Sequence, residues 1–247
     1  NGIIQLESHG QNGTIATDID YLAMAQYCSN TNLTCVMPMP YGLRYEGLAS
    51  GLYEELNQKS VTGAIAFMRG SGYRLACVEE GRFHLCVMSH LAFEYYEQQG
   101  KDIQMVATFG SRSYVEQHRI FVRPDFDGNW QGCKVGLDTS SVDQERLTRF
   151  CFADKPVQYV PIIYSQLVPF LHNGMIDAGV WSADMLPEGL SYYPMPCLDE
   201  QEKDTVAVLV CRKSDNVTAQ LVRKVLSVQN VTDIQRRVMN REIIPRY

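Results

Sequence analysis

Hydrophobic residues along this chain follow two periodicities that alternate with one another. Short apolar runs, such as Leu33–Met37 and residues 63–68, have the length and flanking residues of buried β-strands. Between these runs, Leu48, Leu52 and Leu56 recur at the spacing of a helix with one face on a core. Such alternation of strands and helices predicts right-handed crossovers and largely parallel sheets.

The same two patterns predict the rest of the secondary structure. Further strands are expected at residues 84–89, 103–110, 118–124, 134–138, 157–162, 175–182 and 204–213. Further helices are expected at residues 21–27, 75–78, 90–100, 139–152, 164–174, 218–229 and 231–240. Pro169 lies inside the helical pattern of residues 164–174, so this helix is expected to start late or to kink.

A short internal repeat suggests that the chain contains two similar halves. Residues 80–89 (EGRFHLCVMS) align without gaps with residues 173–182 (NGMIDAGVWS). In both segments a helix ends at a glycine, an apolar strand follows, and a serine stands at the end of the strand. The match predicts two α/β lobes with Ser89 and Ser182 as equivalent serines facing a cleft, although ten residues can also match by chance.

The order of the elements predicts an α/β, two-lobed, periplasmic-binding-protein-like (type II) fold. In this plan the chain crosses between lobes near residues 105–112 and returns near residues 203–210, after an acidic linker at 197–204. The expected organisation is a β-hairpin (1–20), a linker helix (21–31), lobe I (32–108), lobe II (109–204) and a return to lobe I (205–247).

The glycine-rich stretch SHGQNGT (residues 8–14) raises the question of a phosphate-binding loop. Such a loop needs a helix directly after its glycines, because the helix N-terminus supplies free N–H groups to the anion. Residues 14–17 instead alternate as a strand does, and residues 3–7 form a second strand-like run. A β-hairpin around a Gly/Asn turn is therefore expected.

Composition and charge narrow the functional class. A formal net charge of -6 argues against this segment binding DNA or an anionic membrane on its own. No apolar run reaches the roughly 18 residues that cross a bilayer, and no signal peptide is recognisable. The chain begins without Met, so we expect a fragment of a larger cytoplasmic protein.

The eight cysteines allow either a disulfide framework or buried thiols. No CxxC pair occurs, and Cys35, Cys86 and Cys211 lie inside apolar strand-like runs, which favours buried thiols. Four Asn-x-Thr sequons, at Asn12, Asn32, Asn216 and Asn230, would suit a secreted protein, but such short motifs also arise by chance.

Candidate ligand-binding residues follow from the rule that open α/β sheets bind ligands beyond the carboxyl ends of their strands. Applying this rule to each predicted strand end gives one set of residues. This set comprises Tyr41, Arg44, Tyr45, Arg69, Gly70, Ser71, Ser89, His90, Ser111, Thr139, Ser140, Ser141, Tyr164, Trp181 and Ser182.

Within this set, two arginines and a run of hydroxyls suit an anion. Arg44 and Arg69 could clamp a carboxylate or phosphate, and residues 139–141 could offer hydroxyls and helix N-terminal N–H groups. Tyr41 and Trp181 would form apolar walls. Purely structural roles are the alternative: the arginines as surface or ion-pair residues, Ser71 as a helix N-cap, and Ser141 in a capping box with Gln144.

Sequence motifs of catalysis and metal binding are missing. The chain has no G-x-S-x-G elbow, no HExxH and no P-loop. His84 and Cys86 share one strand face but have no further ligands at zinc-like spacing. We therefore predict no catalytic residue, no metal and no cofactor.

Five segments together resemble the C-terminal, ligand-binding domain of YhfZ-type bacterial transcriptional regulators. They read MPMPYGLRYEGLASGL, MRGSGYR, CVMSHLAFEYY, VGLDTSSVDQ and IDAGVWS, and the likeness spans roughly residues 33–247. These regulators are GntR-like proteins with an N-terminal winged helix-turn-helix. The resemblance implies a two-lobed sensor joined to a DNA-binding module and a homodimer, with no known ligand to carry over.

The resemblance also gives the N-terminal hairpin a role. Residues 3–20 resemble the wing of a winged helix, with residues 21–27 as the connector to the sensor. Wings that touch DNA usually carry Arg or Lys near the turn, yet the first basic residue here is Arg44 and only His9 lies in the turn. A role in the linker or dimer interface is equally compatible with this sequence.

The sequence favours a non-catalytic domain that binds a small anionic effector between its lobes. DNA would then be contacted by an N-terminal domain absent from this chain, and no membrane contact is expected. The alternatives are a transport-type solute-binding protein with the same fold and an enzyme built on it. A helix-turn-helix upstream of Asn1 would favour the regulator, and a signal peptide or lipobox would favour the transport protein.

Overall fold

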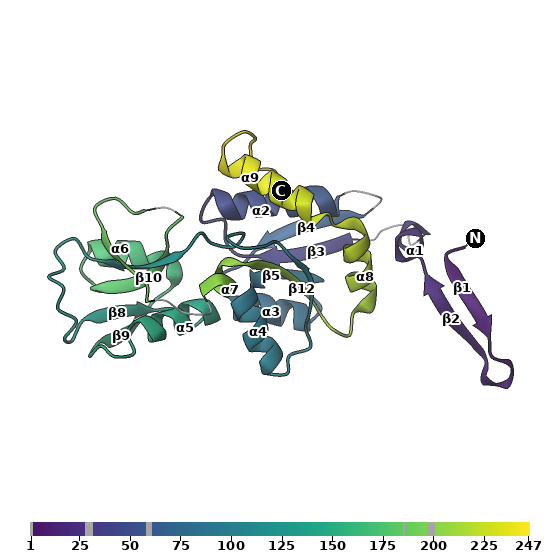
Figure 1. The fold of residues 1–247 in the computed structure, drawn as a ribbon, viewed down its shortest axis with the longest axis horizontal. Helices are drawn as coiled ribbons and strands as arrows, with labels where there is room; N and C mark the ends of the chain where they lie inside the picture. Colours follow the sequence, from purple (N-terminus) through teal and green to yellow (C-terminus); the bar gives the residue numbers. More distant parts are fainter. Residues whose placement is uncertain (1, 28–31, 58–60, 185, 197–200) are drawn as a thin grey trace.

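The chain forms two α/β lobes and a separate N-terminal hairpin (Figure 1). The computed structural model describes residues 2–27, 32–57, 61–184, 186–196 and 201–247. Each lobe is built on a mixed sheet of five strands, and the predicted two-lobed type II fold is confirmed.

The sheet of lobe I has the strand order β4-β3-β5-β12-β6. Strand β3 pairs in parallel with β4 and β5, whereas β12 is antiparallel to both β5 and β6. The bounds are β3 Asn32–Met37, β4 Thr62–Phe67, β5 Leu85–Ser89, β6 Gln104–Thr108 and β12 Ala207–Cys211.

The sheet of lobe II has the order β11-β7-β10-β8-β9. Strand β8 pairs in parallel with β9 and β10, whereas β7 is antiparallel to β10 and β11. The bounds are β7 His118–Val122, β8 Lys134–Leu137, β9 Gln158–Pro161, β10 Ala178–Ser182 and β11 Ser191–Pro194.

The internal repeat falls on equivalent strands of the two sheets. Strand β5 lies between a parallel β3 and an antiparallel β12, and β10 lies between a parallel β8 and an antiparallel β7. The glycines before them, Gly81 and Gly174, both have positive φ after a helix. Strands β7 and β12 follow the two crossings between the lobes. Each runs antiparallel to its neighbours, so the sheets are mixed and the expectation of largely parallel sheets holds for the other strands.

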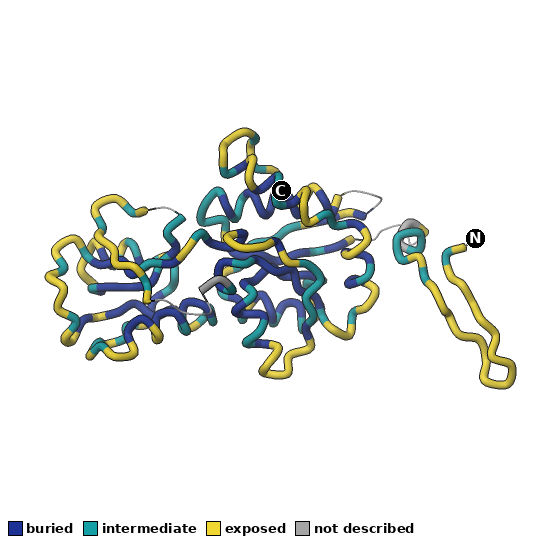
Figure 2. Tube along the Cα trace, viewed as in Figure 1, coloured by how far each residue is buried: buried dark blue, intermediate teal, exposed yellow. Residues whose placement is uncertain are grey.

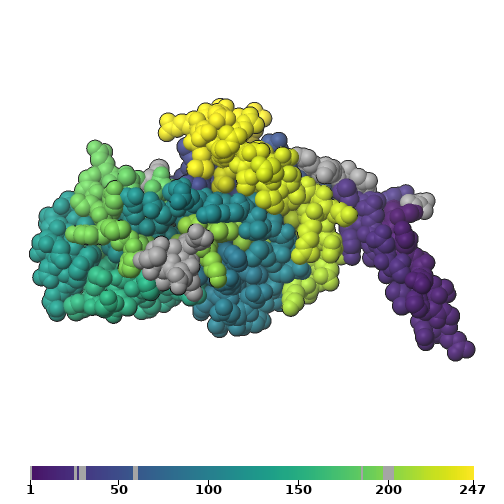
Figure 3. Space-filling model, in the orientation of Figure 1, coloured from purple at the N-terminus to yellow at the C-terminus, as the bar shows by residue number. Residues whose placement is uncertain are grey.

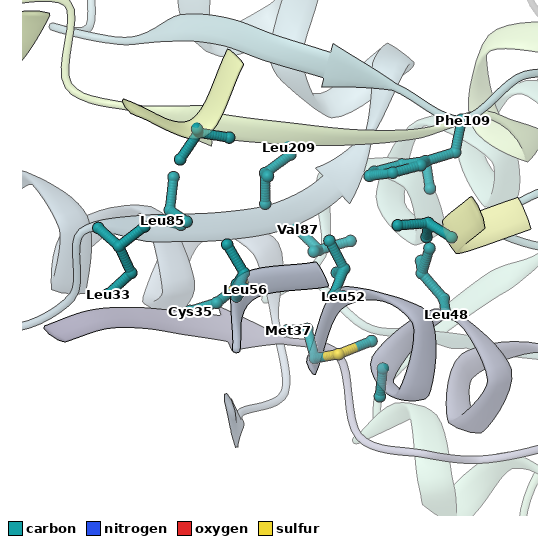
Figure 4. Close-up of a cluster of buried hydrophobic side chains, with 14 of the residues drawn as sticks. Leu33, Cys35, Met37, Leu48, Leu52, Leu56, Leu85, Val87, Phe109 and Leu209 are labelled. Carbon is teal, nitrogen blue, oxygen red and sulfur yellow. The ribbon is translucent and has the colours of Figure 1, made fainter. Parts of the chain in front are cut away.

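Strand residues of lobe I alternate between two hydrophobic cores. Cys35 and Met37 face a core with helices α2, α8 and α9, and Val36 between them faces a second core with α3 and α4. Figure 4 shows the first core, in which Leu48 and Leu52 of α2 meet the sheet. The bounds are α2 Leu43–Leu56, α3 Ser71–Glu79, α4 His90–Gln98, α8 Asn216–Val225 and α9 Val228–Met239.

Lobe II repeats this layering. Helix α5 (Val142–Cys151) packs on one face of the sheet, and α6 (Leu167–His172) packs on the other. The late start predicted from Pro169 is confirmed, because a 3₁₀ turn at Tyr164–Gln166 precedes α6.

Two elements of the structure have no counterpart among the predicted ones. Strand β11 is short, exposed and ends at a proline, so only its pairing with β7 reveals it. Helix α7 (Gln201–Thr205) lies in the segment predicted to be an acidic linker, and it packs against α4 and β5. The chain thus rejoins lobe I a little before residue 205.

The N-terminal hairpin is confirmed and stands away from both lobes (Figures 1 and 3). Strands β1 (Ile4–Ser8) and β2 (Thr14–Ile19) pair antiparallel around a 3₁₀ turn, η1 (Gly10–Asn12), and nearly all of their residues are exposed (Figure 2). Helix α1 (Tyr21–Tyr27) follows as predicted and contacts α8. Stretch 8–14 is therefore a turn between strands, not a phosphate loop.

The described cysteines are free and buried, as predicted. They are Cys35, Cys77, Cys86, Cys133, Cys151 and Cys211, while Cys28 and Cys197 lie outside the described residues. Burial raises the pKa of the Cys86 thiol to about 12, which removes its reactivity near neutral pH. No helix in the described ranges has the length and apolar character to cross a bilayer.

Helices α2 and α9 approach each other closely because α2 carries glycines at the contact. A Cβ added at Gly47 would lie 2.8 Å from the carbonyl oxygen of Gln235. One added at Gly51 would lie 2.7 Å from that of Val231. Both clashes are with backbone, which cannot rotate away.

We predict that Gly47→Ala lowers the free energy of unfolding by roughly 1–3 kcal/mol, because α9 must move outward. Urea unfolding measures the change. Glu54→Ala, on the exposed face of the same helix, is the matched control and should change stability by less than about 0.5 kcal/mol. Equal stability of Gly47→Ala and the unsubstituted chain would contradict the close packing.

Candidate functional site

The two lobes meet through a small number of specific polar contacts. Ser89 Oγ at the end of β5 donates to Asp143 Oδ1 of α5 at 2.7 Å, and both residues are buried. Gly70, before α3, has a φ of 73°, and a Cβ there would lie 2.8 Å from the Ser140 carbonyl oxygen of lobe II. A glycine is therefore required for the lobes to approach this closely.

Arg44 makes the strongest connection between the lobes. Its Nε lies 2.5 Å from Asp184 Oδ1, and its Nη2 lies 2.5 Å from Glu116 Oε2. Its Nη1 also donates to the Arg112 carbonyl oxygen. The guanidinium is largely buried and its charge is balanced by two carboxylates, so in this arrangement Arg44 joins the lobes.

A cavity of about 60 Å³ lies where the two lobes face each other. The N-termini of α3 and α5 both begin at it, since Gly70, Ser71 and Ser141 line it. Neither N-cap residue, Gly70 or Ser141, closes its helix with a side-chain hydrogen bond. Two helix N-termini with open N–H groups make this cavity favourable for negative charge.

Arg74 is the most informative residue of this cavity. Its side chain is buried, with 2% relative exposure, and among the described residues it donates to uncharged acceptors alone. Nε donates to the Val87 carbonyl oxygen at 3.0 Å, Nη1 to that of Met68 at 2.9 Å, and Nη2 to the Tyr114 hydroxyl at 3.1 Å. No ion pair in the described part of the chain balances its charge, which is costly unless an anion is supplied.

Arg69 supplies a second positive charge at the mouth of the cavity. Its side chain is exposed and lies 6.0 Å from the Tyr73 ring centroid, measured from Cζ. Within the described ranges it has no ion pair. It is therefore free to turn toward a ligand that enters the cavity.

Two buried titratable groups of lobe II also line the cavity. Burial raises the pKa of Asp143 to about 6, although the hydrogen bond from Ser89 acts to lower this pKa. Burial opposes the charge of His118, but the hydrogen bond and charge of Asp204 raise its pKa overall. His118 Nδ1 lies 2.5 Å from Asp204 Oδ2, which ties β7 to α7 beside the crossings.

Aromatic side chains form one wall of the site. The rings of Tyr164 and Trp181 stack with centroids 3.8 Å apart, and Tyr41 of lobe I lies 5.6 Å from Tyr164. The Tyr164 hydroxyl accepts a hydrogen bond from the backbone N–H of Ser182 at 3.0 Å. The wall therefore spans both lobes and is held by lobe II.

The structure distributes the predicted site residues over three places. Seven of them line the cavity: Tyr41, Tyr45, Arg69, Gly70, Ser71, Ser141 and Tyr164. Arg44, Trp181 and Ser182 line a smaller adjoining pocket with Tyr41, Tyr45 and Tyr164. Ser111 lines a larger, open cavity beside the crossings, of about 430 Å³. Ser89, His90, Thr139 and Ser140 line none of these.

Four of the residues have structural contacts that the sequence did not indicate. Ser89 is fully buried: its hydroxyl accepts from the Ala92 N–H as the cap of α4 and donates to Asp143 of lobe II, and it does not line the cavity. His90 lies 3.5 Å from Glu94 on the same helix. Ser140 is bonded to Asp138, and Ser182 donates to Asp184 Oδ2 at 2.6 Å.

Neither of the alternative capping roles forms as described. Ser141 is the N-cap of α5, but its side chain makes no capping hydrogen bond, and Gln144 turns to His118 so that no capping box forms. Ser71 is the first residue of α3 and not its cap, which is Gly70. Ser71 Oγ instead lies 3.3 Å from the Tyr96 hydroxyl and 3.5 Å from the Val142 nitrogen of lobe II.

The cavity also contains residues that strand-end reasoning missed, because they lie inside helices or in the crossing. They are Arg74, Tyr114, His118, Asp143 and Gln144. A usable signal exists for Arg74, since it stands four residues before the core residue Val78 and so shares its helix face. Among the described residues, no group of three or more His, Cys, Asp and Glu side chains could hold a metal ion.

Comparison with known proteins places this site in a family. The family model of the YhfZ C-terminal domain matches residues 20–247. The chain belongs to the YhfZ family. The protein YhfZ of Escherichia coli (strain K12) is 31% identical over 251 residues, which cover 100% of this chain and 82% of that protein.

Solved structures agree with this assignment. The crystal structure of YhfZ from Shigella flexneri has a TM-score of 0.77 and 31% identity, covering 92% of this chain and 98% of that one. The periplasmic aliphatic sulphonate binding protein SsuA from Escherichia coli has a TM-score of 0.64 at 12% identity, covering 87% and 76%. The likeness to SsuA shows a shared fold, so YhfZ-family domains are built like solute-binding proteins.

The raised pKa of Asp143 predicts a pH-dependent effect on stability. The folded chain binds this proton more tightly than the unfolded chain, whose carboxyl has the ordinary pKa of 3.8. The Asp143 contribution is therefore most favourable below the unfolded value and is lost as pH rises to about 6.

Asp143→Asn removes this titration and keeps an oxygen that can accept from Ser89. The free energy of unfolding of the variant, relative to the unsubstituted chain, should rise by on the order of 2 kcal/mol between pH 4 and 6. Urea unfolding at a series of pH values measures it. A difference that stays constant over this range would show that Asp143 titrates normally.

Proposed function

We propose that this chain is the ligand-sensing domain of a bacterial transcriptional regulator. A small molecule with an anionic group binds in the cavity between the lobes, and closure of the lobes alters DNA binding by an N-terminal domain. The observation that carries the proposal is the buried guanidinium of Arg74, which has only uncharged acceptors. An anionic ligand supplies the missing charge.

The surroundings of Arg74 support an anion as the ligand. The N-termini of α3 and α5 start at the cavity from opposite lobes, and Arg69 stands at its mouth. Ser71 and Ser141 add hydroxyl groups. The arginine clamp of this proposal is Arg69 with Arg74, since Arg44 is held by Glu116 and Asp184.

Closure provides the coupling in this proposal. The ligand contacts both lobes, so it binds the closed arrangement more tightly and shifts the population toward it. The polar contacts of Arg44 and Ser89 across the lobes form only when the lobes approach. In a homodimer, closure would change the spacing of two DNA-binding domains in the cytoplasm.

A transport-type solute-binding protein is the second candidate, favoured by the shared fold with SsuA. The two candidates differ in their partner. Ligand-dependent DNA binding by the complete protein supports the regulator, and ligand binding with no effect on any DNA supports the transport protein.

Arg74→Gln should remove ligand binding. The unsubstituted protein is incubated with a bacterial metabolite extract and washed, and the molecules that remain bound are identified by mass spectrometry. We expect one small molecule with an anionic group to be retained, with affinity reduced on the order of a hundredfold in Arg74→Gln, and weakened in Arg69→Ala.

Arg82→Gln is the matched control, because Arg82 lies just after the same helix, is exposed, and within the described ranges forms an ion pair with Glu80 alone. This variant should bind normally. Because Arg74 also joins parts of lobe I, circular dichroism must first show that Arg74→Gln is folded, and Arg69→Ala tests the clamp without touching the core. Retention of the same molecule by both Arg74→Gln and Arg69→Ala would contradict the proposed site.

Arg44→Ala should open the lobes. It removes two ion pairs, one with each of Glu116 and Asp184, and destabilises the closed arrangement by on the order of 2 kcal/mol. Small-angle X-ray scattering should give a larger radius of gyration than for Arg149→Ala, which removes an exposed pair within α5. An identical radius for the two variants would mean that Arg44 does not hold the lobes.

A further inference from the structure

Asp143 presents a carboxylate to the same cavity as Arg74. The residue is buried, with 4% relative exposure, and it lines the cavity from lobe II. Its Oδ1 accepts the hydrogen bond of Ser89, while Oδ2 has no hydrogen-bond partner in the described part of the chain. Oδ2 is not one of the fully buried atoms without a partner, so this oxygen is open to the cavity, where a positively charged donor can bind it.

The other carboxylate of the cavity is already satisfied. Asp138 Oδ1 accepts from the N–H and hydroxyl of Ser140, at 2.8 and 2.6 Å, and Oδ2 accepts from the Tyr164 N–H at 2.8 Å. These bonds hold the loop before α5 and leave Asp138 without a need for a ligand. Of these two carboxylates, Asp143 is therefore the one with an oxygen that accepts no hydrogen bond from the described residues.

Arg74 and Asp143 do not satisfy each other. No ion pair joins them, although Arg74 is close enough to lower the pKa of Asp143. They belong to different lobes, Arg74 to α3 and Asp143 to α5. Inside the cavity, a buried positive group of lobe I, Arg74, thus faces a negative group of lobe II, Asp143, and no ion pair in the described residues joins either of them.

We propose that the ligand is a small zwitterion, with its anionic group on Arg74 and its protonated amine on Asp143. This inference rests on the proposed function, because it specifies the ligand of the same cavity. An ion of negative charge alone would neutralise Arg74 but would approach the Asp143 carboxylate without a donor for it. A cation alone would leave Arg74 unbalanced. A zwitterion satisfies both groups.

The placement of the two groups makes the ligand a bridge between the lobes. Its anionic end binds lobe I and its ammonium end binds lobe II, so neither lobe alone offers the complete site. The amine therefore contributes affinity only when the lobes are closed, which gives the ligand the differential affinity that a sensor requires. A molecule without the amine loses this part of the binding energy.

Matched pairs of probes test the amine directly. L-Alanine and β-alanine are compared with propionate, L-serine with 3-hydroxypropionate, and γ-aminobutyrate with butyrate. Taurine is compared with ethanesulfonate, and 2-aminoethylphosphonate with ethylphosphonate. Calorimetry on the unsubstituted chain should find at least one zwitterion that binds roughly tenfold or more tightly than its partner. This comparison needs no variant, so it stands even where a substitution impairs folding.

Variants then assign the amine to its partner. In Asp143→Asn the advantage of the zwitterion over its amine-free partner should fall to within about twofold, whereas Arg74→Lys should weaken both. Asp154→Asn, an exposed acid just after α5, is the control and should keep the advantage.

The outcomes separate this inference from the proposed function. Equal binding of amine-free partners in the unsubstituted chain, lost in Arg74→Lys, would overturn the zwitterion and leave the anion site standing. A zwitterion advantage that survives in Asp143→Asn would overturn the role of Asp143. Binding of neither series, together with no molecule retained from the metabolite extract, would overturn both proposals.

Discussion

A positively charged guanidinium buried between two lobes, without an opposite charge in contact, is the constraint on which the function of this structure depends. Arg74 holds three parts of lobe I together through the Val87 and Met68 carbonyls and the Tyr114 hydroxyl. These bonds fix its geometry but leave its charge unbalanced, and a buried unbalanced charge is expensive. The two helix N-termini that begin at the cavity act in the same direction and favour an anion beside Arg74.

The two crossings of the chain between the lobes explain why the site lies where it does. Strands β7 and β12 are antiparallel insertions at equivalent places of the two sheets, and each follows a crossing between lobes. The crossings pair with one another, since the Phe109 N–H donates to the Ala207 carbonyl and the Tyr114 N–H to that of Thr205. The lobes therefore share a hinge, and the carboxyl ends of their parallel strands face each other across the cavity.

Periodicity alone was enough to predict most helices and strands, because each is buried on a face that apolar spacing reveals. Strand β11 and helix α7 were not predicted because they are short and polar or exposed. Their tertiary contacts, with β7 and α4 respectively, specify them. Among site residues, strand-end reasoning located Arg69, Ser71 and Tyr164, which lie in loops or at helix starts. It did not use the helical spacing that places Arg74 on the same face as Val78. It could not find Asp143, since a charge inside a helix normally faces solvent and its partner Ser89 lies in the opposite lobe. It also could not know that Arg44 meets Asp184, a partner 140 residues away.

A crystal structure of the protein grown with the molecule that it retains from a metabolite extract tests the central claim most directly. The predicted result is an anionic group within hydrogen-bond distance of the Arg74 guanidinium, with the Arg44–Asp184 and Ser89–Asp143 contacts formed around it. A molecule bound elsewhere, for example in the open cavity lined by Ser111, with no anion or ordered ligand at Arg74, would contradict the assignment of the interlobe cavity as the sensing site.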